Sequence, residues 1–267
     1  MTDLILPSNA HFLNFRHRPP DKRLAPWVQC LWSMGGPGQL KTSRTEKLYP
    51  DAGASLSIKL TIPRPIITLC LNRRTLVETF DTSTPSLGIR FKAAGAHGLL
   101  GLPLEAFTDG FHHLEDELEP LGLQELMPIV ERLYQLDEKQ GLRLLETWLL
   151  HRLRRMPILN SRIVMVIQAI RELQLPPQQL GATIGFTRRT LERKLKREVG
   201  VTPGQLVAYA RLNLARHELF ESNRSLAEIA LQCGYYDQAH FTHAFQALAY
   251  ETPAAYRKRK LSQIYKA

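Results

Sequence analysis

The sequence contains few cysteines and no long apolar run, and both scarcities exclude classes of protein. Its three cysteines, Cys30, Cys70 and Cys233, are odd in number and far apart, which fits neither a disulfide framework nor a zinc site and favours a reducing compartment. No apolar run approaches the roughly 18 residues that a membrane span needs, and residues 1–10 lack the pattern of a secretory signal. We therefore expect a cytoplasmic protein that contacts no membrane.

The chain also lacks the residue patterns that enzyme chemistry requires. The predicted strands contain almost no histidine, and no Gly-x-Ser-x-Gly elbow, phosphate-binding glycine loop or dinucleotide fingerprint is present. The adjacent His112 and His113 have no second ligand pair at a suitable spacing, so we do not expect a metal site. The sequence therefore predicts a protein that is not an enzyme and holds no cofactor.

Positive charge is in excess, and the excess is concentrated in one part of the chain. The formal net charge is +10 at pH 7 over 267 residues. Residues 161–267 carry 16 Lys and Arg against 8 Asp and Glu, whereas residues 1–160 carry 19 against 17. A basic segment beside a nearly neutral one suggests a polyanionic partner for the basic segment, and nucleic acid is the candidate.

An acidic stretch breaks the pattern of the N-terminal half. Residues 93–131 contain eight Asp and Glu and no Lys or Arg. Such a stretch is typical of a solvated surface, and it also suits a docking surface for a basic partner, including the chain's own basic domain. The sequence leaves both interpretations open.

Hydrophobic periodicity divides the chain into two parts. Short apolar segments at 55–62, 66–71 and 87–91, separated by Gly and Pro turn signals, predict strands. Apolar residues at three- and four-residue spacing predict helices at 97–102, 121–136 and 138–155. We expect an α+β protein with a β-rich N-terminal domain and trailing helices at 1–155, a linker at 156–160 and an all-α domain at 161–267.

The last predicted helix of the N-terminal domain carries a leucine stripe. Leu142, Leu145, Leu149 and Leu153 lie on one face at helical spacing. Core packing is the favoured interpretation of this stripe, and a homodimer seam is the alternative.

The basic domain contains an internal repeat with a period of about fifty residues. Gly185 corresponds to Gly234 at an offset of 49, and Pro203 corresponds to Pro253 at an offset of 50, so the second copy has one extra residue in its turn. Each copy reads as a helix, a glycine turn and a second helix. Thr187 and Asp237 are the predicted N-caps of the second helices. This arrangement predicts two helix-turn-helix units, whose second helices enter the major groove of double-stranded DNA.

The second helices have one apolar and one polar face. The predicted buried faces are Leu191, Leu195 and Val199 in the first copy, and Phe241, Phe245 and Leu248 in the second. On the polar faces, Arg can bond guanine, Gln can bond adenine and Glu can accept a hydrogen bond from cytosine. Arg188, Lys196 and Arg197 are the predicted phosphate contacts, which supply affinity without sequence information.

The segment between the units predicts one long helix at 203–220. At 1.5 Å per residue it would be roughly 27 Å long, close to the roughly 34 Å between successive major grooves on one face of DNA. One chain would therefore read two adjacent grooves and a long, asymmetric site.

These residues resemble the AraC/XylS family of bacterial transcription regulators. Residues 225–246, with Thr252-Pro253 and Tyr256-Arg257, are similar to the family signature around the second unit, and residues 185–197 and 201–203 are similar to the first. The resemblance implies base contacts from the exposed N-terminal parts of the second helices. They fall on Arg189, Glu192, Arg193, Gln238, His240, Thr242 and His243.

Two residues depart from the pattern of the family. Ala239 stands where relatives often carry a polar residue, and His243 stands where Arg is common, so the contacts at these positions differ from the pattern of the family. A neutral histidine is a weaker partner for an anion than arginine is.

The N-terminal part resembles, less specifically, the sensor-like domains that precede this module in some regulators. Residues 48–53 and 88–103 carry that likeness, which implies a small-molecule effector or self-association and names no ligand. Trp27, Trp32, Tyr49, Asp51 and Phe91 are candidate pocket residues, with core packing as the favoured interpretation of the four aromatic ones. We expect a regulator that recruits or blocks RNA polymerase, and a domain that senses nothing and only recruits other proteins is the alternative.

Overall fold

The computed structural model describes residues 7–36, 43–155, 161–172 and 185–264. Its first part contains eight strands, which form two antiparallel sheets. They are β1 (Arg16–Arg18), β2 (Val28–Met34), β3 (Ser43–Leu48), β4 (Ala54–Lys59), β5 (Ile66–Leu71), β6 (Leu76–Asp81), β7 (Ser86–Phe91) and β8 (Gly110–His113). The larger sheet has the order β1-β2-β7-β4-β5-β8, and β3 pairs with β6 in a sheet of two strands.

Helices follow and flank the strands. In the N-terminal part they are α1 (Pro7–Phe12), α2 (Gly95–Leu100), η1 (Leu104–Phe107), α3 (Leu126–Leu133) and α4 (Glu138–Arg155). In the C-terminal part they are α5 (Ser161–Arg171), α7 (Arg188–Val199), α8 (Pro203–Glu221), α9 (Leu226–Gln232), α10 (Gln238–Ala249) and α11 (Pro253–Ile264). The predicted α+β class, with strands first and helices last, is confirmed.

The three predicted strands are all present, with small differences at their ends. The strand predicted at 55–62 is β4, which ends at Lys59 because the chain then turns, with the Thr61 hydroxyl donating to the Arg64 carbonyl. The predicted helix 121–136 is shorter and begins at Leu126, after Gly122 has taken a left-handed φ of 67°. The strand pattern also missed β1, β2, β3, β6 and β8.

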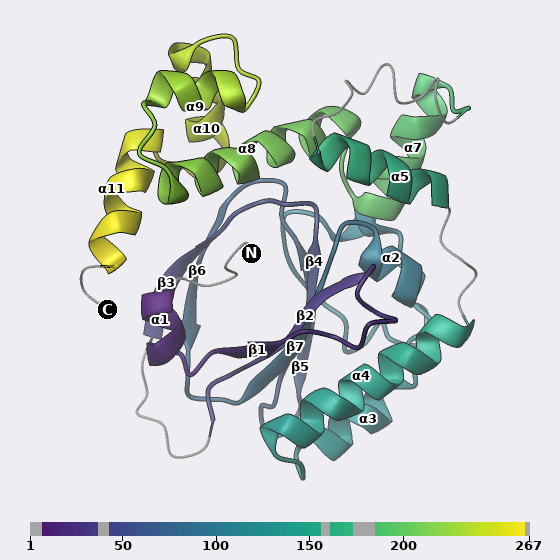
Figure 1. Cartoon of the computed structure of the whole chain (residues 1–267). Coiled ribbons are helices and arrows are strands. Elements are labelled where there is room, and N and C mark those ends of the chain that lie inside the picture. The colour runs from purple at the N-terminus through teal and green to yellow at the C-terminus, as the bar shows by residue number, and fades with distance from the viewer. Residues whose placement is uncertain (1–6, 37–42, 156–160, 173–184, 265–267) are drawn as a thin grey trace.

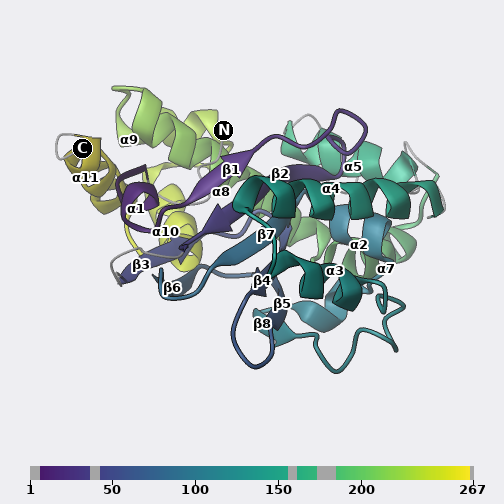
Figure 2. The same ribbon diagram turned by 90° about the horizontal axis from the view of Figure 1, so that it is seen from below.

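The leucine stripe of α4 faces the larger sheet. Leu142, Leu145 and Leu149 are at most 4% exposed, and Leu153 is partly buried against the same core. The helix packs across β2 and β7, as Figure 2 shows. Core packing, the favoured interpretation of the stripe, is therefore confirmed.

Part of the acidic stretch forms ion pairs within the N-terminal part. Asp109 bonds Arg73, and Glu125 bonds Arg152 at 2.7 Å. These two acids therefore bond basic residues of their own domain rather than of the C-terminal part.

The helices of the C-terminal part lie along one side of the strands. In Figure 1, α8 crosses this side and joins α5 and α7 at one end to α9, α10 and α11 at the other. One hydrophobic cluster runs from the larger sheet through α5 and α7 to Leu206 and Tyr209 of α8. A separate cluster joins the second half of α8 to α9, α10 and α11. The two ends of α8 thus belong to different cores.

Candidate nucleic-acid interface

The second helix of each unit begins at the predicted cap. The Thr187 hydroxyl accepts a hydrogen bond from the Thr190 backbone N–H at 3.2 Å, and the Asp237 carboxylate accepts one from the His240 N–H at 2.7 Å. These bonds satisfy amides that a helix N-terminus leaves free. The first helix of the first unit lies outside the described residues.

The turns and the first helix of the second unit also have the predicted geometry. Gly185 and Gly234 have φ angles of 72° and 76°, a left-handed conformation that side chains disfavour. Ser225 and Glu228 form the reciprocal capping box that begins α9. The buried Cys233 thiol follows α9, and burial raises its pKa to about 12.

One face of each second helix is buried. Leu191, Leu195 and Val199 are at most 2% exposed, and Phe241 and Phe245 are fully buried. The prediction for Leu248 is only partly right: this side chain is half-buried, and its neighbour Ala249 takes the fully buried position. The opposite face of each helix remains available to a ligand.

The ten predicted DNA contacts all reach solvent. Eight are exposed and two, Glu192 and Thr242, are half-buried. The exposed residues are Arg188, Arg189, Arg193, Lys196, Arg197, Gln238, His240 and His243. The first five lie on α7 and the other three on α10, at opposite ends of α8.

Some of these side chains already have partners within their own helix. Lys196 and Glu192 form an ion pair at 3.3 Å. The Thr242 hydroxyl donates to the Gln238 carbonyl at 2.8 Å, which leaves its methyl group for an apolar contact. The His240 ring lies edge-on to Tyr235, with ring centroids 5.4 Å apart. A side chain among these that binds DNA would either keep its present contact or exchange it for a contact with DNA.

Tyr236 is an exposed residue that the sequence interpretation missed. Its side chain is 86% exposed beside the first turn of α10, and Leu231 of α9 is 66% exposed nearby in the chain. A single exposed aromatic ring is not unusual on a protein surface, but this one lies in the turn directly before the helix that carries the predicted base contacts. The sequence did contain a signal for this residue, because Tyr236 is the extra residue in the turn of the second copy of the repeat.

The first unit packs against the N-terminal domain. Helix α7 contacts η1 and α2, and Gly200, which ends α7 with a φ of 80°, lies so close that a Cβ there would be 3.0 Å from the Leu104 carbonyl oxygen. The Tyr209 hydroxyl of α8 donates to the Arg73 carbonyl at 2.9 Å. The N-terminal domain therefore contributes to the orientation of α7, together with α8.

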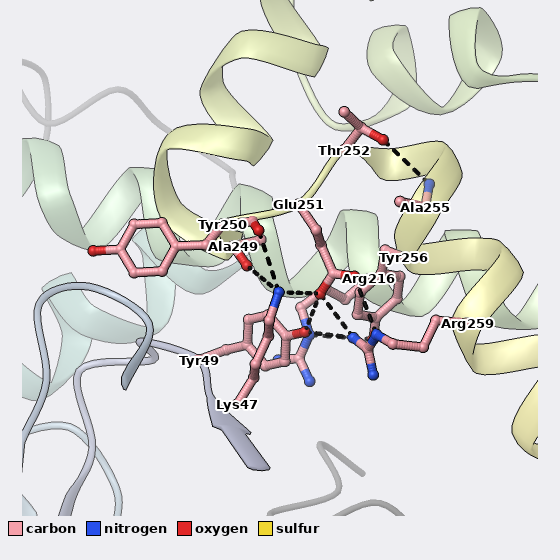
Figure 3. Close-up of polar contacts among 10 residues, drawn as sticks. All are labelled: Lys47, Tyr49, Arg216, Ala249, Tyr250, Glu251, Thr252, Ala255, Tyr256 and Arg259. Atoms are coloured by element: carbon pink, nitrogen blue, oxygen red, sulfur yellow. Dashed lines mark hydrogen bonds and ion pairs between the residues drawn. The ribbon is translucent and has the colours of Figure 1, made fainter. Parts of the chain in front are cut away.

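The second unit contacts the end of β3 through a polar cluster (Figure 3). Glu251, between α10 and α11, accepts from the Tyr49 hydroxyl at 2.7 Å, from Lys47 at 3.1 Å and from Arg259 at 2.8 Å. Burial alone would raise the pKa of Glu251, but hydrogen bonds from Arg259, Tyr49 and Lys47 outweigh it and hold the pKa below its ordinary value. We call Lys47, Tyr49, Glu251 and Arg259 the domain clamp.

The candidate effector residues divide into two groups. Trp32, Tyr49 and Asp51 line a cavity beside the domain clamp. Phe91 is fully buried in the core and Trp27 packs against this core, as the favoured interpretation predicted for the aromatic candidates.

Two further features concern metals and membranes. The described residues contain no cluster of three or more His, Cys, Asp or Glu that could hold a metal ion. Across the same ranges, no helix is both long and apolar enough to cross a bilayer.

Two segments of the chain match known domain families. Residues 180–259 match the helix-turn-helix domain, and residues 16–113 match a domain of unknown function (DUF6597). The HTH-type transcriptional activator RhaS of Klebsiella pneumoniae is 38% identical over 69 residues, which are 26% of this chain and 25% of that protein. The match thus spans about a quarter of the length of this relative.

Two solved structures of similar sequence each cover about two fifths of the chain. A transcriptional regulator of Chromobacterium violaceum, described as containing an AraC-type DNA-binding domain, is 29% identical and covers 38% of this chain and 89% of that one, with a TM-score of 0.34. The DNA-binding domain of AdpA, solved with a target DNA, is 26% identical and covers 40% and 98%, with a TM-score of 0.37. By the match to the helix-turn-helix family and the similarity to RhaS, the C-terminal segment of this chain is a helix-turn-helix domain of the AraC type.

Proposed function

We propose that this chain is a sequence-specific DNA-binding transcription regulator that reads two adjacent major grooves with α7 and α10. The observation that supports this proposal most strongly concerns the second helix of each unit. Each of these helices has an N-terminal cap, buries one apolar face and presents its polar side chains to solvent. Helix α8, of 19 residues, separates them, which corresponds to about 28 Å along its axis. That length suits two helices that enter successive grooves.

We assign base contacts and phosphate contacts as the sequence predicted them. Arg189, Glu192 and Arg193 would read bases from α7, and Gln238, His240, Thr242 and His243 from α10. Arg188, Lys196 and Arg197 would hold phosphate oxygens. We add Tyr236 as a further contact, because its exposed ring lies in the turn directly before α10.

The remaining parts of the proposal concern the cell and the N-terminal domain. We place the protein in the bacterial cytoplasm, where it would recruit or block RNA polymerase; likeness to the activator RhaS favours recruitment. The N-terminal domain would respond to a small-molecule effector or hold a homodimer. Because the leucine stripe of α4 is buried, a homodimer would need another surface.

Binding selection from a random duplex library tests the proposal. The full chain is used at physiological salt, because α7 shares its core with the N-terminal domain and a fragment of 161–267 would expose that face. The expected result is one enriched site with two boxes about 10 base pairs apart. Two such pairs would indicate a homodimer.

Two other results would count against parts of the proposal. A single enriched box would show that α10 contacts only the DNA backbone. Salt-sensitive binding without any enrichment would remove the claim of sequence specificity. The matched control is a chain with Gln238→Ala and His243→Ala, which should lose the second box and keep the first.

A further inference from the structure

A cavity of about 100 Å³ lies between the larger sheet, the β3–β6 pair and helix α8. Its sheet wall is built by register: Arg90 of β7 is opposite Ser55 of β4, Ser55 is opposite Cys70 of β5, and Cys70 is opposite Phe111 of β8. Residues paired directly across neighbouring strands point to the same face. These four side chains therefore form one row across the floor of the cavity.

Arg90 is buried in this floor with one donor unused. Its side chain is 7% exposed, Nη2 bonds the Asp51 carboxylate and Nη1 donates to the Ser55 hydroxyl at 3.1 Å. Burial alone would raise the pKa of Asp51, but the charge and hydrogen bonds of Arg90 keep it below its ordinary value, so Asp51 is ionised and neutralises Arg90. The Arg90 Nε–H has no hydrogen-bond partner among the described residues, and a buried donor of this kind normally has one.

Arg216 reaches the same cavity from α8 of the DNA-binding domain. Its guanidinium lies 3.9 Å from the centre of the Tyr49 ring (Figure 3) and donates to two neutral groups, the Asn213 side-chain oxygen at 3.2 Å and the Tyr256 hydroxyl at 3.3 Å. Within the described ranges, Arg216 has no ion pair with a carboxylate, and its Nη2 has no hydrogen-bond partner. A half-buried cation without a counter-charge attracts an anion.

The charges of the lining are unbalanced. Lys47, Arg90 and Arg216 line the cavity, with Asp51 as the acid among its lining residues. Asp51 neutralises Arg90, and Glu251 of the domain clamp pairs with Lys47 from outside the cavity. The remaining positive charge is that of Arg216.

We propose that this cavity binds a small organic carboxylate, which pairs with Arg216 and places an oxygen acceptor on the Arg90 Nε–H. Guanidinium groups bind carboxylates more strongly than they bind neutral acceptors. The walls formed by Phe15, Trp32, Met34 and Phe80 give the site an apolar side, so the ligand carries a compact hydrocarbon group. A cavity of about 150 Å³ holds benzene, so the smaller cavity here, of about 100 Å³, limits that group to a short alkyl chain.

The inference deepens the proposed function, since it names the chemistry of the effector and the residue through which the DNA-binding domain contacts it. A ligand held by Arg90 and Arg216 at once would bond the sheet to α8. It would therefore stabilise the orientation of the two reading helices that the structure shows.

The test measures ligand binding by the full chain without DNA, so its result does not depend on whether the protein reads DNA. The probes are 3-methylbutanoate and 2-methylpropanoate, each compared with its neutral amide by thermal shift and calorimetry at millimolar concentration. Both carboxylates are expected to raise the Tm, because a ligand that binds the folded state stabilises it. The amides, which match the carboxylates in size and lack the charge, are expected to give a much smaller shift.

Variants locate the site. Arg216→Met should weaken carboxylate affinity about tenfold or more, whereas Arg216→Lys should keep part of it. Ser57→Leu, which fills the cavity from β4, should abolish binding without changing the net charge. Equal shifts from acids and amides, no shift from either, or carboxylate affinity that is unchanged in Arg216→Met would each overturn the inference. Each variant is compared with its own ligand-free Tm, so a change in stability does not imitate a change in affinity.

Discussion

Single residues on α7 have separable roles in the proposed DNA complex. Arg193 and Lys196 are both exposed and basic. A guanidinium can bond the two acceptors of guanine at once, whereas an ammonium acts on phosphate as a point charge. Their substitutions should therefore change different properties of binding.

Arg193→Ala should cost about 1–3 kcal/mol on the selected site and relax specificity at one base position. The measurement is equilibrium binding to the selected duplex and to its single-base variants. An equal loss of affinity for every sequence would show that Arg193 does not read a base.

Lys196→Ala should lower affinity for all sequences and reduce the slope of log affinity against log salt by about 1. Titrations at several salt concentrations check this. The result is opposite in kind to that of Arg193→Ala, so each variant serves as the control for the other. An unchanged salt slope would remove Lys196 from the phosphate contacts.

The Asp51–Arg90 pair allows a stability prediction at the residue scale. Asp51→Asn leaves the buried Arg90 without its counter-charge, and breaking a buried pair in this way typically costs about 3–5 kcal/mol. Unfolding by denaturant at neutral pH measures the loss. The control is Asp21→Asn at the exposed Asp21–Arg23 pair, which should change stability much less. Equal losses in the two variants would contradict the role given to the buried pair.

At the scale of elements, both second helices depend on their caps. Asp237 accepts the His240 N–H at the start of α10, where the base-reading side chains begin. Because the cap bond is local, the sequence was sufficient to predict it.

Asp237→Ala should destabilise the second unit by about 1 kcal/mol and weaken DNA binding through the first turn of α10. Asp237→Ser, which keeps a capping oxygen, should retain most of both properties. Denaturant unfolding and DNA binding measure the two effects. A loss in Asp237→Ser as large as that in Asp237→Ala would show that the charge of Asp237, rather than its capping bond, is what matters.

At the scale of the whole molecule, the N-terminal domain holds both reading units at separate places. It packs against α7 through η1 and α2, and it holds the turn after α10 through the domain clamp. The relative orientation of the two helix-turn-helix units is therefore set by the N-terminal domain as well as by α8.

The domain clamp should weaken in acid. The folded-state pKa of Glu251 lies below its ordinary value of 4.5, so its ionised form stabilises the fold above that pH, and the contribution is lost as pH falls through the folded-state pKa. At pH 7, Glu251→Gln should lower the free energy of unfolding by about 1.5–3 kcal/mol. The difference from wild type should shrink as the pH approaches about 3.

Urea unfolding at both pH values measures this difference. Glu221→Gln, at an exposed position at the end of α8, is the control and should show little difference at either pH. A gap between Glu251→Gln and wild type that stays constant with pH would contradict the role of the ionised carboxylate.

The sequence by itself determined the features that depend on local interactions. The caps Thr187 and Asp237, the turn glycines, and a connector helix that differs from the prediction by one residue all follow from bonds within a few residues of each other. The strands at β4, β5 and β7 were predictable because their apolar residues are buried in the larger sheet.

The tertiary structure alone decided the features that join distant parts of the chain. Strand β3 reads Ser-Arg-Thr-Glu-Lys-Leu, which has no apolar alternation, and it exists because β6 pairs with it. Lys47 meets Glu251 across 204 positions, and Arg216 reaches a cavity whose floor belongs to another domain. No periodicity encodes such contacts, since they depend on how whole elements pack. The cavity and the domain clamp therefore became visible only once the sheet, α8 and the turn after α10 were placed together.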